Sequence, residues 1–479
     1  MTTLVVASVL YILAVLGVGI AANKRSTRSP EEYFLAGRTL GTFVLFMALF
    51  GTNCTAFVLV GIPGQAYHDG VGIFGVNAPI IALVVPLTFW AIGSPARKMA
   101  GRLGAMTPAE LYAKRFGSRP LGILLFVVFT AYTLPYMASA LKGAAITLTH
   151  VSEGAIPEWA GALGAMSLAL TYTTLGGMRA TAWTNVMQGT IFLLFMMGAF
   201  FLVSDSMGGL EAAMERVRSL NSQLLVVGEG RYFSPKAWFS WSIIISLTVV
   251  AFPHMLVRLM SAEDDKALKG AARLYPPALI LLWLPAVLLG VWGAALYPGL
   301  EGRMSDEIFS RLIRDMPVVL TALGFLAVVA AVMSTLDAQI LTLSSMLTRD
   351  VLRDPQDQVR TGRLFSVLFA VAAFLATLWG ASIFQIARFA FGGYVTLVPT
   401  LFLGVRWRRF TVQGAVASIV CGNLVLILAR LDLWPLFGFL EGLWGFGIAA
   451  VVAVGVSLLT PPADVKVTQQ AFGERSIRT

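Results

Sequence analysis

The sequence predicts an all-α polytopic membrane protein with about thirteen membrane-spanning helices. Of its 479 residues, 57% are hydrophobic and only 13% are charged, and the mean hydropathy is +0.79. Soluble domains carry about 25% charged residues, so this composition excludes an ordinary soluble protein. The apolar residues gather in runs of about 20, which is the length that crosses a bilayer. Short polar breaks separate these runs, so we expect the chain to cross the membrane repeatedly.

The first expected element is a leading helix over residues 3–22. No basic residue precedes its apolar run, and Lys24 and Arg25 follow it directly. This charge order is the reverse of that in a cleaved signal peptide, so we expect a retained span with the N terminus outside. Twelve further spans are expected at 40–66, 71–92, 119–140, 157–175, 183–204, 237–258, 273–297, 317–347, 363–380, 383–405, 411–430 and 438–460.

The basic residues support this count and predict an orientation. With the N terminus outside, 25 of the 35 Lys and Arg residues fall at the inner side, as the positive-inside rule requires. The net charge of +10 therefore reflects topology, and nucleic acid is not expected as a partner. We expect a multi-pass protein of the cell (inner or plasma) membrane with a cytoplasmic C terminus.

Two of the expected spans contain helix-breaking residues. The first is LFGTNCTAFVLVGIPGQAYHDG, within and just after 40–66, and the second is SLTVVAFPHMLVR, at the end of 237–258. They lie five helices apart. Interrupted helices at matching positions predict a transporter built from inverted repeats, and the alternative is a pair of ordinary kinks.

This pattern divides the chain into five parts. They are a leading helix with an inner loop (1–39), a first five-helix repeat (40–205), an outer loop (206–236), a second, inverted repeat (237–405), and two trailing helices with a short cytoplasmic tail (406–479). Within the outer loop, GGLEAAMERVRSL is amphipathic and predicts a short surface helix.

The most polar expected span contains Val329–Asp350, with the sequence VAAVMSTLDAQILTLSSMLTRD. A carboxylate deep in the membrane costs about 3 kcal/mol on insertion scales, so Asp337 indicates a functional site. Together with Ser334 and Thr335, it predicts that this stretch binds a cation.

Other chemistry finds no support in the sequence. The two cysteines and three histidines are scattered and lack the spacing of metal ligands. A phosphate-binding glycine loop is missing, which argues against ATP-driven pumping, and no catalytic pair is evident. We therefore do not expect an enzyme, nor a metal other than Na+.

Five motifs follow one another along the chain from Glu31 to Asp350. They are EEYFLAGRTLG (31–41), TNCTAFVLVGIPGQAY (52–67), TYTTLGGMRATAWTNVMQ (171–188), FPHMLVRLMSAED (252–264) and AAVMSTLDAQILTLSSMLTRD (330–350). This ordered set resembles the sodium:solute symporter family, and most nearly its bacterial proline, pantothenate and monocarboxylate carriers. The resemblance implies the five-plus-five inverted-repeat core of the leucine transporter, with one leading and two trailing helices.

The resemblance also implies a sodium site between the first and eighth core helices. Its ligands would be the backbone carbonyls of Gly51, Cys54 and Ala331 and the hydroxyls of Ser334 and Thr335. Neutral oxygens suit a hard cation that must also be released. Taken singly, such hydroxyls more often bond back to a carbonyl of their own helix.

A small-molecule substrate would lie beside the sodium, at the two breaks. The residues implied are Asn53, Thr55, Gln65, Tyr132, Pro253 and His254. Tyr132 either contacts the substrate or packs in the core, and His254 either binds a carboxylate substrate or caps the broken helix. Arg38 and Arg258 are candidates for an inner gate, and the alternative for Arg258 is a side chain that extends to the cytoplasmic surface.

One departure from the family pattern suggests a second cation or proton site. Many members carry an aspartate where this chain has Asn185, whereas here Asp337 appears in the facing stretch of the eighth core helix. We hypothesise an exchange in which Asp337 faces Asn185 and supplies the charge from the other helix. The alternative is a structural hydrogen bond.

The expected function is sodium-coupled import of a small organic solute by alternating access. The solute would be a monocarboxylate or pantothenate-like acid, or a proline-like amino acid. A proton-coupled transporter of the same fold remains an alternative because of Asp337, and a symporter-like membrane sensor is another. The expected partners are Na+, the solute and the lipid bilayer, with no obligate protein partner.

Overall fold

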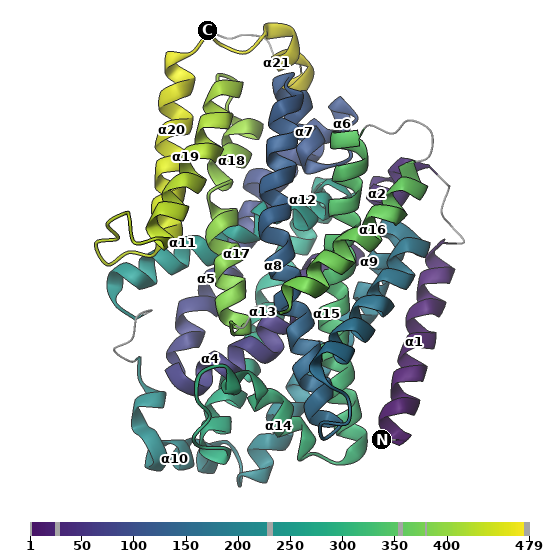
Figure 1. Cartoon of the computed structure of the whole chain (residues 1–479), viewed down its shortest axis with the longest axis vertical. Helices are drawn as coiled ribbons and strands as arrows, with labels where there is room; N and C mark the ends of the chain where they lie inside the picture. Colours follow the sequence, from purple (N-terminus) through teal and green to yellow (C-terminus); the bar gives the residue numbers. More distant parts are fainter. Residues whose placement is uncertain (1, 24–28, 228–232, 353–357, 379–380, 474–479) are drawn as a thin grey trace.

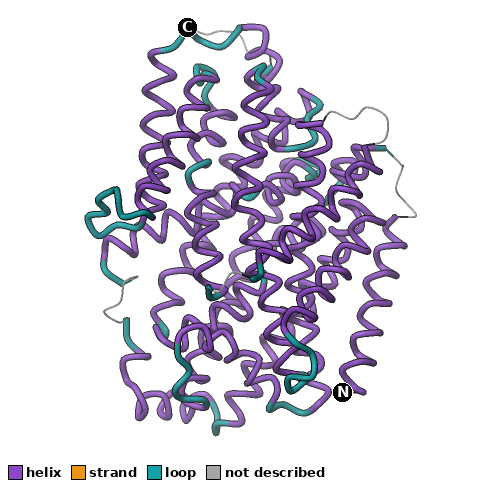
Figure 2. The backbone as a smooth tube through the Cα atoms, viewed as in Figure 1, coloured by secondary structure: helices purple, strands orange, loops and turns teal. Residues whose placement is uncertain are grey.

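The computed structural model describes residues 2–23, 29–227, 233–352, 358–378 and 381–473. These residues form helices joined by loops (Figures 1 and 2), and the described chain has no strand beyond an isolated bridge between Leu40 and Ala262. The predicted all-α architecture is confirmed. Parts of the expected inner loop (24–28), outer loop (228–232) and tail (474–479) lie outside the described residues.

The helices follow one another in the order shown by the colours of Figure 1. They are α1 (Thr2–Asn23), α2 (Pro30–Leu35), α3 (Thr42–Asn53), α4 (Ile62–Asp69), α5 (Gly72–Thr88), α6 (Ser94–Leu103), α7 (Pro108–Phe116), α8 (Arg119–Val151), α9 (Glu158–Ser206), α10 (Leu210–Asn221), α11 (Pro235–Ala251), α12 (Pro253–Met260), α13 (Asp265–Leu296), α14 (Ile308–Arg314), α15 (Val318–Met346), α16 (Gln358–Ala376), α17 (Ile383–Val395), α18 (Val398–Arg406), α19 (Val412–Arg430), α20 (Glu441–Leu459) and α21 (Val465–Phe472).

Ten helices of the described chain are long and apolar enough to cross a membrane, or twelve if each of two bent pairs is one span. The predicted count of thirteen is therefore not confirmed. The difference lies in α9, which contains both expected spans 157–175 and 183–204. Its helical dihedrals are interrupted at Gly177 (φ 60°, ψ −160°), and only the part from Gly177 to Ser206 meets the criteria for a span.

Several helices are longer than the apolar runs that predict them. The expected spans 71–92 and 119–140 continue as helix to Leu103 and Val151, and 273–297 begins at Asp265. Hydropathy marks where the chain is apolar, whereas capping residues end the helices. Gly104 ends α6 in a left-handed conformation, and the Asp264 carboxylate accepts the Ala267 N–H at the start of α13.

Two bent pairs lie at matching positions of the fold. The pair α3–α4 and the pair α11–α12 each bend by 53°. Beside them, α15 packs against α9, α8, α16 and α1, and its residues from Gly324 to Met346 are buried. The polar stretch singled out in the sequence therefore lies inside the protein rather than against lipid.

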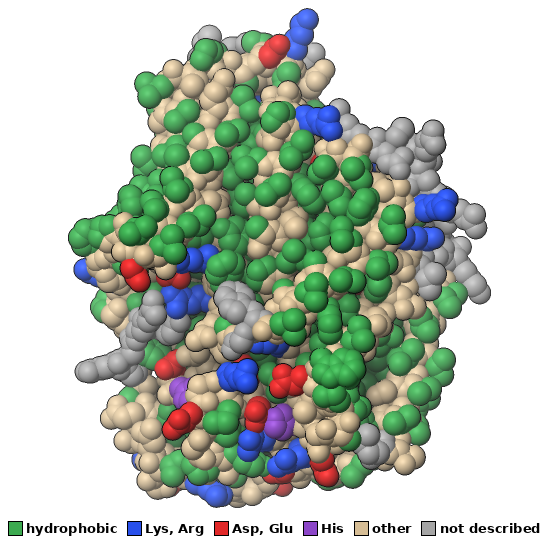
Figure 3. Space-filling view, in the orientation of Figure 1, with side chains coloured by type: hydrophobic (Ala, Val, Ile, Leu, Met, Phe, Trp, Pro, Cys, Tyr) green, Lys and Arg blue, Asp and Glu red, His purple; other side chains and the backbone are tan. Residues whose placement is uncertain are grey.

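The surface agrees with a protein that crosses a membrane. Figure 3 shows hydrophobic side chains over the middle of the visible face, while charged side chains gather mainly toward its lower end. The N-terminal helix α1 begins at the lower end in Figure 1, and α20 ends at the upper end. The predicted amphipathic surface helix is confirmed as α10.

Candidate functional site

The two breaks arise from local sequence. Helix α3 ends at Asn53, and Cys54 takes non-helical dihedrals (φ −93°, ψ 89°). In the other pair, Pro253 forces the preceding Phe252 into an extended conformation (φ −63°, ψ 123°) and starts α12, because a residue before proline avoids helical dihedrals. Next to the first break, Gly143 of α8 lies against Ala56 so closely that a side chain would clash with it.

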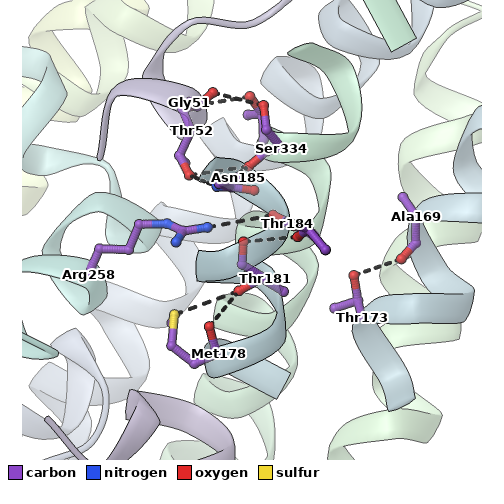
Figure 4. A network of polar contacts seen from close by, with 12 residues as sticks. Gly51, Thr52, Ala169, Thr173, Met178, Thr181, Thr184, Asn185, Arg258 and Ser334 are labelled. Atoms are coloured by element: carbon purple, nitrogen blue, oxygen red, sulfur yellow. Dashed lines mark hydrogen bonds and ion pairs between the residues drawn. The ribbon is translucent and has the colours of Figure 1, made fainter. Parts of the chain in front are cut away.

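The first break leaves carbonyl groups without helical partners, since the last four carbonyls of a helix have no N–H within it. Two of them meet hydroxyls of α15. Ser334 Oγ lies 2.8 Å from Gly51 O (Figure 4). Thr335 Oγ1 lies 3.0 Å from Thr52 O. The same hydroxyls lie 2.9 and 3.3 Å from Ala331 O. Five oxygens from two helices therefore converge.

This oxygen cluster has fewer hydrogens than acceptors. Each hydroxyl has one hydrogen but lies within hydrogen-bond reach of two carbonyls. The contacts to Ala331 are ordinary for helix hydroxyls, whereas the contacts to Gly51 and Thr52 cross to another helix. All of these oxygens are uncharged and their residues are buried. Such a set is the kind of ligand shell that a hard monovalent cation accepts.

Four of the five predicted sodium ligands thus lie together, namely Gly51, Ala331, Ser334 and Thr335. Cys54 is buried at the end of α3, where its N–H bonds to Phe50 O at 3.0 Å. The residue missed by the sequence reasoning is Thr52. Its carbonyl faces Thr335 and its hydroxyl lies 3.2 Å from Ser334 O. The signal was its place just before the break, where consecutive carbonyls are freed.

Asn185 joins α9 to this cluster. Its Nδ2 donates to Thr52 Oγ1 at 2.9 Å and to Ser334 O at 3.2 Å, as Figure 4 shows. Its Oδ1 is buried and has no hydrogen-bond partner in the described part of the chain. Asn185 thus holds three helices together and leaves one acceptor available.

Asp337 has a charged partner that the sequence did not predict. Its Oδ1 lies 3.6 Å from Arg258 Nη2, and both side chains are 0% exposed. The expectation that Arg258 extends to the cytoplasmic surface is therefore wrong. Its side chain reaches instead from α12 into the polar region beside Asn185 (Figure 4). The hypothesis that Asp337 faces Asn185 stays a prediction, with Arg258 as the counter-charge now found beside it.

The second break presents a histidine to its surroundings. His254 is fully buried, and both its ring nitrogens lack hydrogen-bond partners among the described residues. Its ring stacks on Phe252 at 5.2 Å between centroids and lies 6.5 Å from Tyr136. The alternative in which His254 caps the broken helix is wrong, because α12 has no side-chain cap.

Comparison with known proteins decides the family. A model of the sodium:solute symporter family matches residues 33–422. This chain belongs to that family. It is therefore a transporter and not an enzyme, and the resemblance seen in the motifs is confirmed.

Relatives and solved structures agree with this assignment. The symporter is 29% identical to the sodium/pantothenate symporter of Escherichia coli (strain K12), over 89% of this chain and 90% of the relative. It is 27% identical to the sodium/proline symporter of the same strain, over 99% and 96%.

Among solved structures, a Na+-coupled sialic acid symporter in a substrate-bound, outward-open state has a TM-score of 0.80 at 17% identity, over 96% of this chain and 99% of that chain. A nucleobase-cation-symport-1 family transporter in a closed conformation has a TM-score of 0.62 at 14% identity, over 92% and 99%. These likenesses bear on the fold, and the predicted leucine-transporter-like fold class is confirmed.

The remaining predicted substrate residues of the symporter have different surroundings. Thr55 Oγ1 accepts the Phe57 N–H at 2.9 Å, and Asn53 Nδ2 donates to the Tyr275 hydroxyl at 2.5 Å. Gln65 donates to the Asp69 carboxylate within α4. At the second break, Phe252 and His254 both stack on one aromatic residue, Tyr136, which the sequence reasoning passed over.

Tyr132 lies one helical turn before Tyr136. Its hydroxyl donates to Asn423 Oδ1 of α19 at 2.6 Å, and its ring lies 6.0 Å from Phe389 and 5.9 Å from Tyr394. These contacts favour the packing role that the sequence left open. Tyr132 and Tyr136 are on the same face of α8, so the periodicity of the sequence could not choose between them.

Arg38 lies where the symporter's first and sixth core helices meet at the predicted inner side. Its guanidinium donates to Ala105 O at 2.7 Å and Met260 O at 3.4 Å, and pairs with Glu31 at 2.9 Å. Next to it, Leu40 N bonds to Ser261 O at 3.2 Å, and Glu263 N bonds to Leu40 O at 3.1 Å. These contacts tie the start of α3 to the end of α12. A gating role for Arg38 stays a prediction.

Proposed function

We propose that this symporter moves a small organic solute across the membrane together with Na+, and that Na+ binds in the oxygen cluster between α3 and α15. One observation carries the proposal. Ser334 and Thr335 each lie between a carbonyl of their own helix and a freed carbonyl of α3. A cation among these oxygens would hold the two helices together. The carbonyl of Cys54 is a further candidate ligand.

Coupling follows from where this cluster lies. It joins α3, in the proposed first repeat, to α15, in the proposed second repeat. A bound ion shifts a conformational equilibrium only by the difference of its affinities for the two states. Na+ would favour the state in which α3 and α15 stay joined at this point, and its loss would free them to separate. A membrane potential of 100 mV adds about 2.3 kcal/mol per charge to this drive.

For the solute, we propose a monocarboxylate, with a pantothenate-like acid or a proline-like amino acid as the leading classes. The support is the unpartnered ring of His254, which can donate one hydrogen bond to a carboxylate. Phe252 and Tyr136 stack beside it and can contact an apolar body. Pantothenate and proline both carry a carboxylate, and both are named among the substrates of similar transporters.

Proton coupling at Asp337 is the second candidate. The ion pair with Arg258 weighs against it, because a guanidinium at 3.6 Å already supplies a positive charge to this carboxylate. We therefore propose that Asp337 and Arg258 form a fixed pair and that the transported cation binds at the oxygen cluster. Asp337→Asn should be less stable, but an unchanged sodium concentration for half-maximal uptake in this variant would support the assignment.

The test is uptake by proteoliposomes under an imposed sodium gradient, with radiolabelled pantothenate and proline as probes. Ser334→Ala and Thr335→Ala should abolish the stimulation by sodium. Ser345→Ala is the matched control, since within the described residues the Ser345 hydroxyl bonds to Thr342 O of its own turn and to no other helix. Full sodium stimulation in the Ser334→Ala and Thr335→Ala variants would refute the sodium assignment.

We further propose that the N terminus lies outside the cell and the C terminus in the cytoplasm, which terminal tags and protease protection would check.

A further inference from the structure

A cavity lined mainly by basic side chains shares no lining residue with the proposed transport site. It has a volume of about 450 Å³ and lies between α6, the first turns of α13, the end of α18 and α21. In Figure 1, α6 and α21 are at the upper end of the molecule. The distribution of Lys and Arg along the sequence predicts that this end is cytoplasmic. Four cations line the cavity, Lys98, Arg102, Lys269 and Arg406, against one carboxylate, Asp265.

The single carboxylate of this basic cavity is already neutralised. Asp265 pairs with Arg97 at 3.0 Å and also with Lys98. In the described part of the chain, Lys269 and Arg406 have no ion pair with a carboxylate. Arg406 is held in place by the carbonyls of Ala91 and Trp90, at 2.8 and 3.2 Å, and its guanidinium lies 5.0 Å from the Trp90 ring centre. The cavity therefore keeps an excess of positive charge fixed in position.

The basic cavity begins where the lipid-facing surface ends. Leu83, Leu87 and Trp90 are all at least 60% exposed and are spaced four and three residues apart, so they form one stripe along the helix. The same spacing continues to Ser94 and Lys98, which line the cavity. Tryptophan is enriched at the membrane interface, so the change from leucine to lysine marks the depth of the phospholipid headgroups.

A second helix shows the same change. Phe402 of α18 is 41% exposed, and Arg406, one turn later, lines the cavity. The cavity also has an apolar wall, formed by Leu268, Val405 and Phe472. A free inorganic anion would gain nothing from such a wall, whereas an acyl chain continuing along the leucine stripe would.

We propose that this basic cavity binds the phosphate headgroup of an anionic phospholipid. Basic pockets between transmembrane helices on the cytoplasmic side are suited to such headgroups. The bound lipid would connect α6, α13, α18 and the C-terminal α21. This site is separate from the sodium cluster and the substrate region, and the proposal does not depend on the identity of the solute.

The experiment uses the purified full-length protein in detergent, with phosphatidylglycerol and phosphatidylcholine as probes. Bound lipid is counted by native mass spectrometry, and the thermal midpoint is measured at rising lipid concentration. Phosphatidylglycerol should bind and raise the midpoint more than phosphatidylcholine. Each surface cation contributes about 1 kcal/mol to attraction of anionic lipid, which corresponds to about fivefold in affinity. Lys269→Gln should therefore bind phosphatidylglycerol about fivefold more weakly, and Lys269→Gln with Arg406→Gln more weakly still.

The matched control is Arg273→Gln. Arg273 is exposed on the same helix, one turn beyond Lys269, and does not line the cavity, so this variant should keep the wild-type affinity. Equal responses to the two lipids, or equal losses in Lys269→Gln and Arg273→Gln, would overturn the proposal. Inorganic phosphate is the third arm. If millimolar phosphate alone reproduces the thermal shift, the cavity is a free-anion site and the lipid assignment fails. The single variant keeps the test valid if the double variant does not fold.

Discussion

The two breaks bend by the same 53° but differ in chemistry. At the first break, between α3 and α4, the freed carbonyls of Gly51 and Thr52 meet hydroxyls of α15. At the second, between α11 and α12, the imidazole of His254 has no hydrogen-bond partner among the described residues, and the charge of Arg258 faces Asp337. The same kind of helix break therefore presents uncharged oxygens in one half of the protein and hydrogen-bond donors in the other. This difference is what a site for a cation beside an anion requires.

The largest expected effect concerns the charged pair at the second break. Asp337→Asn leaves Arg258 buried without its counter-charge, and breaking a buried pair in this way costs about 3–5 kcal/mol. The thermal midpoint of the purified protein should fall accordingly. The double variant Arg258→Met with Asp337→Leu removes both charges and should recover most of the loss. If the double variant is as unstable as the single one, the pair is not what stabilises this region.

His254→Phe separates the two breaks by function. Phenylalanine keeps the stacking on Phe252 but removes both ring nitrogens, so a hydrogen bond to a charged substrate, worth about 1.5–3 kcal/mol, is lost. The KM for the solute should rise about 10- to 100-fold while the sodium concentration for half-maximal uptake stays unchanged. Stability should not fall, since the ring nitrogens have no partner to lose. An equal change in the KM for the solute and in the sodium concentration for half-maximal uptake would show that the second break does not act on the solute alone.

Asp306 lies beside Gly64 of α4 and hydrogen-bonds α17, and its titration should make the stability of the protein depend on pH. Its Oδ2 accepts the Ile383 N–H at 2.9 Å. Burial raises the pKa of Asp306 to about 6, although that hydrogen bond and Lys142 act to lower it and Glu307 adds to the rise. The folded protein thus holds this proton up to a higher pH than the unfolded chain. Its stability should fall as the pH rises from about 4 to about 6. Thermal unfolding across this range should show the slope, and Asp306→Asn should flatten it.

The smallest effect distinguishes two tyrosines of α8. Tyr132→Phe loses one hydrogen bond to Asn423, so stability should fall by about 1 kcal/mol with normal uptake. Tyr136→Phe removes the hydroxyl of the ring that stacks with Phe252 and His254 at the second break, so the KM for the solute should rise. Normal KM in Tyr136→Phe together with a raised KM in Tyr132→Phe would reverse the assignment.

Sequence reasoning predicted those features that depend on local chemistry. Proline and glycine within apolar runs located both breaks, and the hydroxyl pair Ser334 and Thr335 located one side of the cluster. It could not predict that Arg258 meets Asp337, because 79 positions separate them and the contact depends on how α12 and α15 are rotated against each other. Thr52 was missed for a related reason. Which freed carbonyl faces a hydroxyl depends on the residue at which α3 ends.

The number of spans shows a different limit. Apolar runs divide α9 into two expected spans, and the helical backbone is indeed interrupted between them at Gly177, but only the second part is apolar enough to count as a span. Hydropathy also ended two spans about three turns before Leu103 and Val151, where Gly104 and Ser152 cap the helices. Composition therefore located the membrane-embedded segments better than it located the helix ends.

The most direct test of the central claim is equilibrium binding of radioactive sodium to the purified protein without solute. The account predicts saturable binding in the wild type and in the Ser345→Ala control, and a loss of at least tenfold in affinity in both Ser334→Ala and Thr335→Ala. His254→Phe should bind sodium as the wild type does. Wild-type sodium affinity in Ser334→Ala and Thr335→Ala would contradict the assignment of the oxygen cluster as the cation site.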